Sequence, residues 1–226
     1  MKTPPFGAIF DWDGVIIDSA ELHEQSWHQL AHELGTEIAP GSFVRGFGMK
    51  SAQIIEQIHH WATAPEEIAR LTNRKEAIYR EIAGHTAIAP LPGVVEWLQR
   101  LSESDVPCAV ASSTQRANIE AVLERVGLQD AFRVIVSAED VAHGKPNSEV
   151  FEKAAARLGI EAGRSIVFED AHVGIEAARA AGMKVVAVTT THQASQLSAA
   201  DLVVSRLDEL TVEAMMAFLE RPTLPS

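Results

Sequence analysis

Short apolar runs and amphipathic segments of helix length alternate through the second half of the chain. The apolar runs, each of strand length, cover residues 108–111, 134–136, 166–168, 185–188 and 202–204. Segments with helical periodicity cover residues 94–102, 118–126, 150–158 and 174–181, with helix stops at Gly127, Gly159 and Gly182. Near-continuous apolar strands that alternate with helices predict a Rossmann-like α/β fold, in which a parallel sheet has helices on both faces.

The N-terminal part of the chain has a different pattern. Residues 7–10 form an apolar run of strand length, but the next strand begins only near residue 106. A crossover between parallel strands needs about 10–12 residues, so most of the intervening segment is an insertion. We predict an α/β core of residues 1–17 and 88–226, with an α-helical domain of residues 18–87 inserted into it.

Within the insertion, apolar residues at helical spacing predict about three helices and no strand. The first runs from after residue 18 to Gly35, and a loop at residues 36–50 separates it from the second, at residues 51–62. The third follows Pro65 and ends near Gly84, and Thr63 and Glu66 before it have the spacing of a capping box.

Charge and composition narrow the range of partners. The 226 residues carry a formal net charge of −12 and no basic run, which disfavours a nucleic-acid phosphate backbone as a partner. No apolar stretch reaches the ~20 residues of a membrane helix, and the N-terminus has no signal-peptide pattern. The single cysteine, Cys108, lies in a predicted strand, where core packing is favoured over a role as a nucleophile, and it can form no internal disulfide. These features predict a cytoplasmic protein.

Two carboxylates follow the first predicted strand. Asp11 and Asp13 are separated only by Trp12, and residues i and i+2 at the end of a strand point to the same side. Two like charges held close together are costly unless a cation or a shared proton relieves them. Because Mg²⁺ prefers oxygen ligands, the pair predicts a magnesium site, with an acidic turn that binds nothing as the simpler alternative.

Other polar groups follow the later strands. Ser112, Ser113 and Thr114 come after the second strand, Lys145 precedes a helix, and Glu169 and Asp170 follow the fourth strand. Taken singly, these residues are typical of a helix cap, an exposed lysine and a polar turn. Parallel sheets bind ligands at the carboxyl ends of their strands, so we expect these groups to meet Asp11 and Asp13 at one rim.

The order of these motifs resembles that of the haloacid dehalogenase superfamily of phosphotransferases. FDWDG (residues 10–14) matches the first motif, ASST (111–114) the second, GKPNSEVF (144–151) the third and FEDAHVGIEAARAAGM (168–183) the fourth. The resemblance covers essentially the whole chain. The insertion resembles the α-helical cap of the β-phosphoglucomutase and phosphoglycolate phosphatase group, and the runs DSAELH (18–23) and TTTHQASQL (189–197) are similar to members of that group.

The resemblance assigns roles to these residues. It implies that Asp11 is the nucleophile that forms an aspartyl phosphate and that Asp13 is the general acid and base. It implies Mg²⁺ held by Asp11, the backbone carbonyl of Asp13 and Asp170, with Glu169 acting through a bound water. Ser112 and Lys145 would bind the phosphoryl oxygens.

Further positions are predicted to bind substrate. His23 matches the family's hinge histidine, and Lys75 matches a cap lysine of the group. Lys50, Ser113 and Thr114 complete the predicted substrate-binding residues.

The expected function is a Mg²⁺-dependent phosphatase acting on a small phosphorylated metabolite. A sugar phosphomutase is the main alternative. In the mutases a cap arginine binds the distal phosphate of the substrate, but the corresponding residues 46–51 contain Gly48, Met49 and Lys50 and no arginine. A haloacid dehalogenase would lack the second aspartate, so Asp13 argues against that activity, and the filled catalytic positions argue against a mere binding module. The sequence specifies neither the metabolite nor the oligomeric state.

Overall fold

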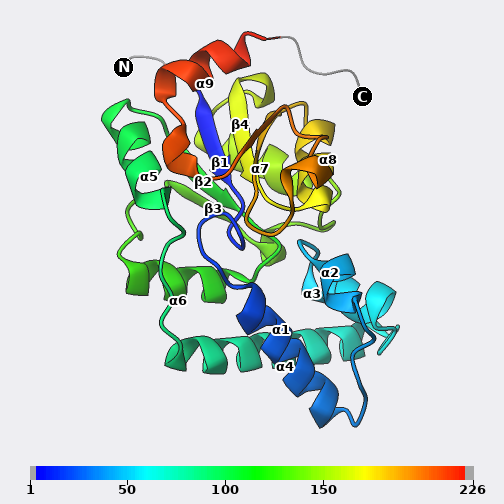
Figure 1. Cartoon of the computed structure of the whole chain (residues 1–226). Coiled ribbons are helices and arrows are strands. Elements are labelled where there is room, and N and C mark those ends of the chain that lie inside the picture. The colour runs from blue at the N-terminus through cyan, green and yellow to red at the C-terminus, as the bar shows by residue number, and fades with distance from the viewer. Residues whose placement is uncertain (1–3, 222–226) are drawn as a thin grey trace.

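Six parallel strands form the centre of the computed structural model, which describes residues 4–221 (Figure 1). The strands are β1 (Gly7–Phe10), β2 (Cys108–Ala111), β3 (Val134–Val136), β4 (Ser165–Glu169), β5 (Lys184–Val188) and β6 (Leu202–Val204). Their order in the sheet is β3-β2-β1-β4-β5-β6. Phe10 at the end of β1 is in register with Val110 of β2 and Phe168 of β4. The residues that follow these three strands therefore share one edge of the sheet.

Helices cover both faces of the sheet, as predicted. One face packs against α5 (Val94–Glu103), α6 (Arg116–Val126) and α9 (Val212–Leu219), and the other packs against α7 (Glu149–Leu158) and α8 (His172–Ala180). Successive residues of β1 point to opposite faces of the sheet: Ala8 and Phe10 belong to the apolar cluster on one face and Ile9 to the cluster on the other. Both sides of β1 are thus buried, which explains its continuous apolar sequence.

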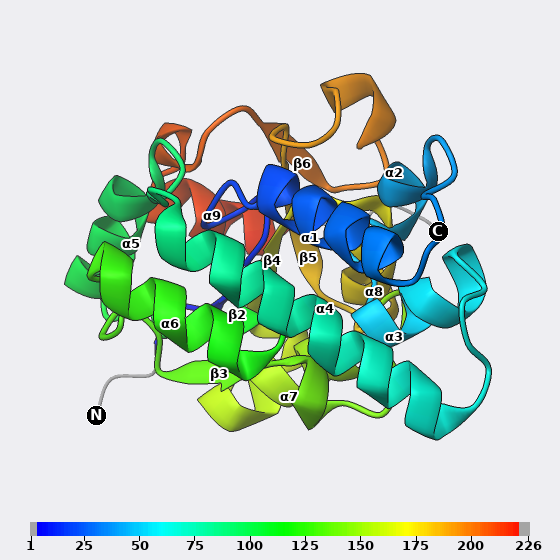
Figure 2. The same cartoon turned by 90° about the horizontal axis from the view of Figure 1, so that it is seen from below.

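The inserted segment, residues 18–87, is helical and has an apolar cluster of its own. It contains α1 (Ala20–Glu33), α2 (Ser42–Gly46), α3 (Ser51–Gln53), which continues into a π-helical turn (Ile54–Ile58), and α4 (Pro65–His85). Trp27 and Leu30 of α1 pack with Ile55, and with Leu71 and Ile78 of α4. Figures 1 and 2 show α1 and α4 side by side below the carboxyl edge of the sheet, with α4 running along α6.

Two chain segments connect this helical insertion to the sheet, and they lie next to each other. Ile17 forms an isolated bridge with Pro90, and the Leu91 N–H donates to the Ile16 carbonyl at 2.9 Å. The insertion therefore leaves and re-enters the core at one place, close to the end of β1.

Several details of the insertion differ from the sequence predictions. The predicted loop at residues 36–50 contains α2, and the predicted helix at 51–62 ends at Ile58, before His60 adopts a left-handed φ of 56°. The predicted capping box is wrong: α4 begins at Pro65 with Ala64 as its N-cap, so Thr63 lies one residue too early to cap it. Proline in the first turn is as predicted.

Two further observations bear on the predictions from composition. No helix within residues 4–221 is long and apolar enough to cross a bilayer. Cys108 is buried in β2, where burial raises the pKa of its thiol to about 12. A thiol with so high a pKa is a packing residue and not a nucleophile at neutral pH.

Candidate active site

Asp11 and Asp13 stand at the end of the central strand, where the chain turns sharply. Asp11 is buried, and its N–H donates to the Phe168 carbonyl of β4 at 2.9 Å. The turn is completed by Gly14, which has a φ of +78°. A Cβ at Gly14 would overlap the carboxylate of Asp170, so only glycine lets the two loops approach this closely.

The predicted acidic residues from β1 and β4 meet at this edge. Oxygen atoms of Asp11, Glu169 and Asp170 all lie within 4.8 Å of one another, and all three residues are buried. The Nζ atom of Lys145 lies 2.8 Å from Asp11 Oδ1 and 2.5 Å from Glu169 Oε1. One ammonium group therefore pairs with two of three buried carboxylates, which leaves an excess of negative charge.

Burial and, to a smaller extent, this excess of negative charge raise the pKa values of two of these carboxylates. Burial raises the pKa of Asp11 to about 7, with Glu169 and Asp13 adding to the effect and Lys145 opposing it. Burial and the charges of Glu169 and Asp11 also raise the pKa of Asp170 well above its usual value. A bound divalent cation would favour the ionised form of both groups.

The carboxylate oxygens of the cluster differ in whether they are available to bind such a cation. Asp170 Oδ1 is buried and has no hydrogen-bond partner within residues 4–221, while Oδ2 accepts from the Thr191 hydroxyl. The oxygens of Glu169 are already engaged: Oε1 accepts from Lys145, and Oε2 accepts from the N–H groups of Asp170 and Ala171 at 2.7 and 2.8 Å. Asp11 and Asp170 thus offer buried carboxylate oxygens suited to a hard cation such as Mg²⁺, whereas Glu169 holds the loop and Lys145 in place.

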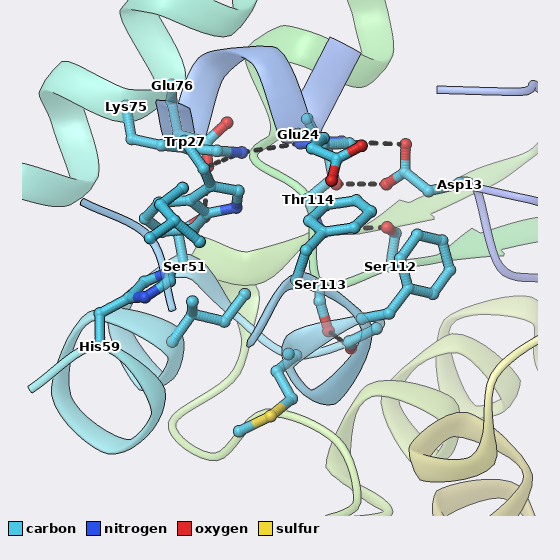
Figure 3. A pocket seen from close by; sticks show the side chains of 18 of the residues that line it. Asp13, Glu24, Trp27, Ser51, His59, Lys75, Glu76, Ser112, Ser113 and Thr114 are labelled. Carbon is cyan, nitrogen blue, oxygen red and sulfur yellow. Dashed lines mark hydrogen bonds and ion pairs between the residues drawn. The ribbon is translucent and has the colours of Figure 1, made fainter. Parts of the chain in front are cut away.

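Asp13 has different surroundings from Asp11. Its Oδ1 accepts from the Ser19 hydroxyl and lies 3.2 Å from His23 Nε2. Its Oδ2 accepts from the Thr114 hydroxyl (Figure 3). Although burial opposes ionisation, the interaction with His23 and the hydrogen bonds from Ser19 and Thr114 lower the pKa of Asp13 to about 2. The two neighbouring carboxylates are therefore differentiated by their environments.

The three hydroxyl residues after β2 are used in three ways. Ser112 Oγ is buried and accepts from the Thr114 N–H at 3.1 Å, which leaves its own proton free for a ligand. Ser113 Oγ donates to the Gly48 carbonyl of the helical insertion at 2.7 Å, and Thr114 donates to Asp13. Of the three, Ser112 has the environment that best suits a phosphoryl ligand.

The predicted substrate-binding lysines are both engaged by protein groups. Lys75 is 1% exposed, and its Nζ lies 2.7 Å from His23 Nδ1 and 3.1 Å from Glu76 Oε1. Lys50 donates to the Val141 carbonyl of the core at 2.9 Å and does not line the cavity described next. Direct contact of either lysine with substrate stays a prediction.

A cavity extends from the acidic residues into the helical insertion (Figure 3). Asp11, Asp13 and Ser112 line one end of it. The other end is mostly apolar and aromatic, with Trp27, Ile38, Phe43, Phe47, Met49, Ile54 and His59. His59 stacks on Trp61 with ring centroids 4.3 Å apart, and burial, together with the charges of Arg45 and His60, lowers its pKa to about 4. His59 is therefore uncharged at neutral pH and belongs to the apolar wall.

The sequence prediction does not include several residues of this site. Trp27, His59 and Glu76 line the cavity, and the Thr191 hydroxyl donates to Asp170. His192 places its Nδ1 atom 3.0 Å from the Asp170 carbonyl oxygen. The run TTTHQ (189–193) is the one available signal, because its hydroxyl residues follow the end of β5 at the same edge.

Comparison with known proteins gives a consistent result. A family model for haloacid dehalogenase-like hydrolases matches residues 8–188. The chloroplastic 5-amino-6-(5-phospho-D-ribitylamino)uracil phosphatase of Arabidopsis thaliana is 39% identical over 209 residues, which span 91% of this chain but only 56% of that protein. The validoxylamine A 7'-phosphate phosphatase of Streptomyces hygroscopicus subsp. limoneus is 32% identical over 203 residues, spanning 90% of this chain and 94% of that protein.

A solved structure agrees with the fold. The crystal structure of β-phosphoglucomutase from Clostridium difficile matches with a TM-score of 0.84 at 27% identity, covering 94% of this chain and 96% of that one. The match includes the sheet and the helical insertion, since it spans nearly the whole of both chains. The chain therefore belongs to the haloacid dehalogenase-like hydrolase family, in the group that contains both phosphatases and phosphoglucomutases.

Proposed function

We propose that the protein is a Mg²⁺-dependent phosphatase that hydrolyses a small phosphorylated metabolite through an aspartyl phosphate on Asp11. The observation that carries the proposal is the position of Asp11 at the end of β1. It lines the cavity, lies 2.8 Å from Lys145 and stands beside the buried oxygens of Asp170. The relatives named as phosphatases support the same reaction class.

The reaction has two balanced steps. In the first, an oxygen of Asp11 attacks phosphorus, the bond from phosphorus to the leaving oxygen breaks, and Asp13 gives that oxygen a proton. In the second, water attacks phosphorus, Asp13 takes the proton of the water, and the bond from phosphorus to Asp11 breaks to release inorganic phosphate. Asp13 is ionised before substrate enters, since its pKa is about 2. It takes up a proton from solvent as the substrate binds, because the like charge of the phosphoryl dianion raises the pKa of the carboxyl group.

The remaining polar groups orient and stabilise the phosphoryl group. Lys145 keeps Asp11 in place and offsets the charge of the entering dianion, and Ser112 donates its free proton to a phosphoryl oxygen. Asp11, Asp170 and the backbone carbonyl of Asp13 would hold Mg²⁺. Glu169, which the family resemblance assigns to the metal through a bound water, instead holds Lys145 and the N–H groups of Asp170 and Ala171. The cation would supply charge neutralisation for the phosphoryl oxygens.

We propose that the helical insertion, residues 18–87, is a cap over a core of residues 1–17 and 88–226. Ser113 donates to the Gly48 carbonyl, and Lys50 donates to the Val141 carbonyl, so the two parts meet across the cavity. Substrate then enters only when these contacts open, through bending where Ile16 and Ile17 lie beside Pro90 and Leu91. Closure excludes water other than the attacking molecule.

The cavity lining supports a monophosphate with an uncharged, partly flat leaving group. Its outer wall includes Trp27, Phe43 and the uncharged His59, surfaces on which a ring can stack. The plant relative is named for a substrate that joins a phosphorylated ribityl chain to a uracil ring, which is a molecule of this kind.

A phosphomutase is the second candidate, favoured by the structural match to β-phosphoglucomutase. That reaction returns the phosphoryl group to a sugar and needs a cation for the distal phosphate. Among the described residues that line the cavity, the one lysine is Lys75, and it is already engaged by His23 and Glu76. A phosphate-release screen over sugar phosphates, ribityl phosphates and nucleotides, run beside a β-glucose 1-phosphate isomerisation assay, separates the two functions.

The decisive experiment compares Asp11→Asn with Asp13→Asn. p-Nitrophenolate leaves with little help from an acid, so Asp13→Asn still phosphorylates Asp11 once and then stalls, with turnover lower by about 10²–10⁴-fold. Asp11→Asn has no attacking oxygen anion and forms no phosphoenzyme. Rapid-quench mass spectrometry should find the phosphorylated Asp11 peptide in Asp13→Asn alone; a phosphoryl group on another residue would refute the assignment.

A further inference from the structure

A row of buried and half-buried polar side chains connects Asp13 to helix α6 of the core by way of the cap. His23 Nε2 lies 3.2 Å from Asp13, His23 Nδ1 lies 2.7 Å from Lys75, and Lys75 Nζ lies 3.1 Å from Glu76 (Figure 3). Glu76 Oε2 then accepts from Asn118 Nδ2 at 2.6 Å. The three middle residues belong to the cap and the two end residues to the core, so the row is complete only when cap and core are in contact.

Asn118 is recognised by the cap at both ends of its carboxamide. Its Nδ2 donates to Glu76 Oε2, and its Oδ1 accepts from Arg80 Nη1 at 2.8 Å. Glu76 and Arg80 are one turn apart on α4, so both reach the same residue of α6. An acceptor faces the amide donor and a donor faces the amide acceptor, which is a match that few other side chains could provide.

Glu76 has a second function in the row through its other oxygen. Oε1 accepts from Ser51 at 2.5 Å and from Lys75 at 3.1 Å. Glu76 is 2% exposed, and although burial opposes ionisation, Lys75, His23 and these hydrogen bonds lower its pKa. An ionised carboxylate that is buried needs all of its partners, so the bond from Asn118 contributes to fixing the carboxylate that holds Lys75.

The contact of Lys75 with Nδ1 ensures that the other ring nitrogen of His23, Nε2, carries the hydrogen that faces Asp13. If the Lys75 ammonium donates to Nδ1, the hydrogen of the neutral imidazole is on Nε2. If instead a charged imidazole donates from Nδ1 to Lys75, Nε2 also carries a hydrogen. In both cases Nε2 donates to Asp13. The His23 ring is also stacked on Tyr79 of α4, with centroids 4.3 Å apart. The orientation of His23 therefore depends on the position of α4, which Asn118 fixes.

We propose that Asn118 is the core residue that the closed cap recognises, and that Glu76 is a positioning residue whose bond to Asn118 aligns Lys75 and His23 on Asp13. The inference rests on the proposed role of Asp13. Opening the cap separates Glu76 and Arg80 from Asn118, so the row is aligned in the closed state alone. Proton transfer at Asp13 is thereby linked to closure over substrate.

An exchange of donor and acceptor tests the bond directly. Glu76→Gln keeps an oxygen for Ser51 and Lys75 but turns an amide group towards the amide of Asn118, and Asn118→Asp places a second carboxylate against Glu76. Each single change should lower kcat for p-nitrophenyl phosphate by roughly 10- to 100-fold, with a smaller change in KM. In the double variant the new amide at position 76 can donate to the new carboxylate at position 118, which still accepts from Arg80, so most of the loss should be recovered.

Hydrogen exchange provides a readout that does not depend on turnover. With Mg²⁺ and fluoroberyllate, peptides covering residues 74–80 and 115–122 should exchange faster in each single variant than in the wild type, and at the wild-type rate in the double variant. If the wild type hydrolyses no phosphomonoester, the proposed function fails, whereas the exchange comparison still decides whether Asn118 and Glu76 join cap and core.

Two results would overturn the inference. In one, Asn118→Asp leaves both kcat and exchange unchanged, so that Glu76 only neutralises Lys75 within the cap. In the other, the double variant is no better than the worse single variant, so that the two residues act separately. If a single variant fails to fold, Arg80→Met provides the test, because Arg80 is half-buried and its loss leaves Glu76 intact. Arg80→Met should speed exchange in the same two peptides, and unchanged exchange would contradict the proposal.

Discussion

Gly174 in the first turn of α8 lies directly against the carboxylate of Glu169, and a Cβ at position 174 would overlap Glu169 Oε1. Glu169 holds Lys145 through the same oxygen and the N–H groups of Asp170 and Ala171 through the other. The missing side chain at position 174 is therefore what allows Glu169 to fix both the lysine and the predicted metal ligand. The motif FEDAHVG owes its glycine to this contact.

The first prediction concerns Gly174→Ala. Because overpacking a closely packed site costs about 1–3 kcal/mol, the free energy of unfolding should fall by that amount, and phosphatase activity should fall as Lys145 and Asp170 move. Denaturant titration and kcat measure the two effects. Gly84→Ala is the matched control: it lies in α4 with no atom within 4 Å of the added Cβ, so it should stabilise by about 0.5–1 kcal/mol and leave kcat unchanged. Unchanged activity in Gly174→Ala would show that Glu169 is not held in this way.

The arrangement of the core and its acidic edge could be predicted from the sequence. The apolar strands are continuous because both faces of the sheet are covered, and this pattern identifies β1, β2 and β4 directly. Once the strands are known, parallel pairing brings Asp11, Ser112 and Asp170 to one edge, whatever the details of the loops. Local pattern and sheet geometry thus determine this part of the site.

The interface between cap and core could not be predicted in the same way. Glu76 and Asn118 are polar residues on helices, 42 positions apart, and a hydrophobic pattern assigns such residues to solvent. They are buried because α4 packs against both α1 and α6, so that it has polar contacts on a second buried side. Helix α2 could not be predicted because its five residues are too few to show a helical period.

The second prediction concerns the metal. Asp170→Asn removes a negative charge and a hard oxygen ligand, so Mg²⁺ affinity measured by calorimetry should fall by roughly 10-fold or more, and EDTA should abolish activity of the wild type. Thr191→Val is the matched control, because it removes the hydroxyl that binds Asp170 Oδ2 and keeps the carboxylate, and its loss of affinity should be smaller. Full activity in EDTA would contradict the metal site.

The third prediction is a pH dependence of stability from Asp140. Although burial opposes ionisation, hydrogen bonds from Arg157, Ser137 and Arg116 hold the pKa of Asp140 well below its usual value. A pKa that is lower in the folded than in the unfolded state stabilises the fold above the unfolded value of about 3.9, and this stabilisation is lost as the pH falls through the folded value. Asp140→Asn should therefore cost about 1–3 kcal/mol at pH 7, and the difference from wild type should shrink below about pH 4.

Urea titrations at a series of pH values measure this difference. Asp130→Asn, at an exposed residue, removes the same charge and should cost little at any pH. If the loss in Asp140→Asn were equally large at pH 7 and at pH 2, the carboxylate charge would not be its cause.

The last prediction tests closure of the cap at Gly48. Gly48 has a φ of +81°, its carbonyl accepts from Ser113, and a Cβ there would lie 2.8 Å from Val173 Cγ2 and 3.1 Å from Ala171 Cβ of the core. Gly48→Ala should hold the cap away from the core and lower kcat/KM by up to about 100-fold, since small displacements of bound groups cost that much. Gly35→Ala shares the backbone strain, with a φ of +68°, but its Cβ would meet nothing within 4 Å, so it should lose about 1–3 kcal/mol of stability and keep its kcat/KM. Equal losses of kcat/KM in the two variants would mean that strain, and not contact with Val173 and Ala171, is responsible, and the cap would not close through Gly48.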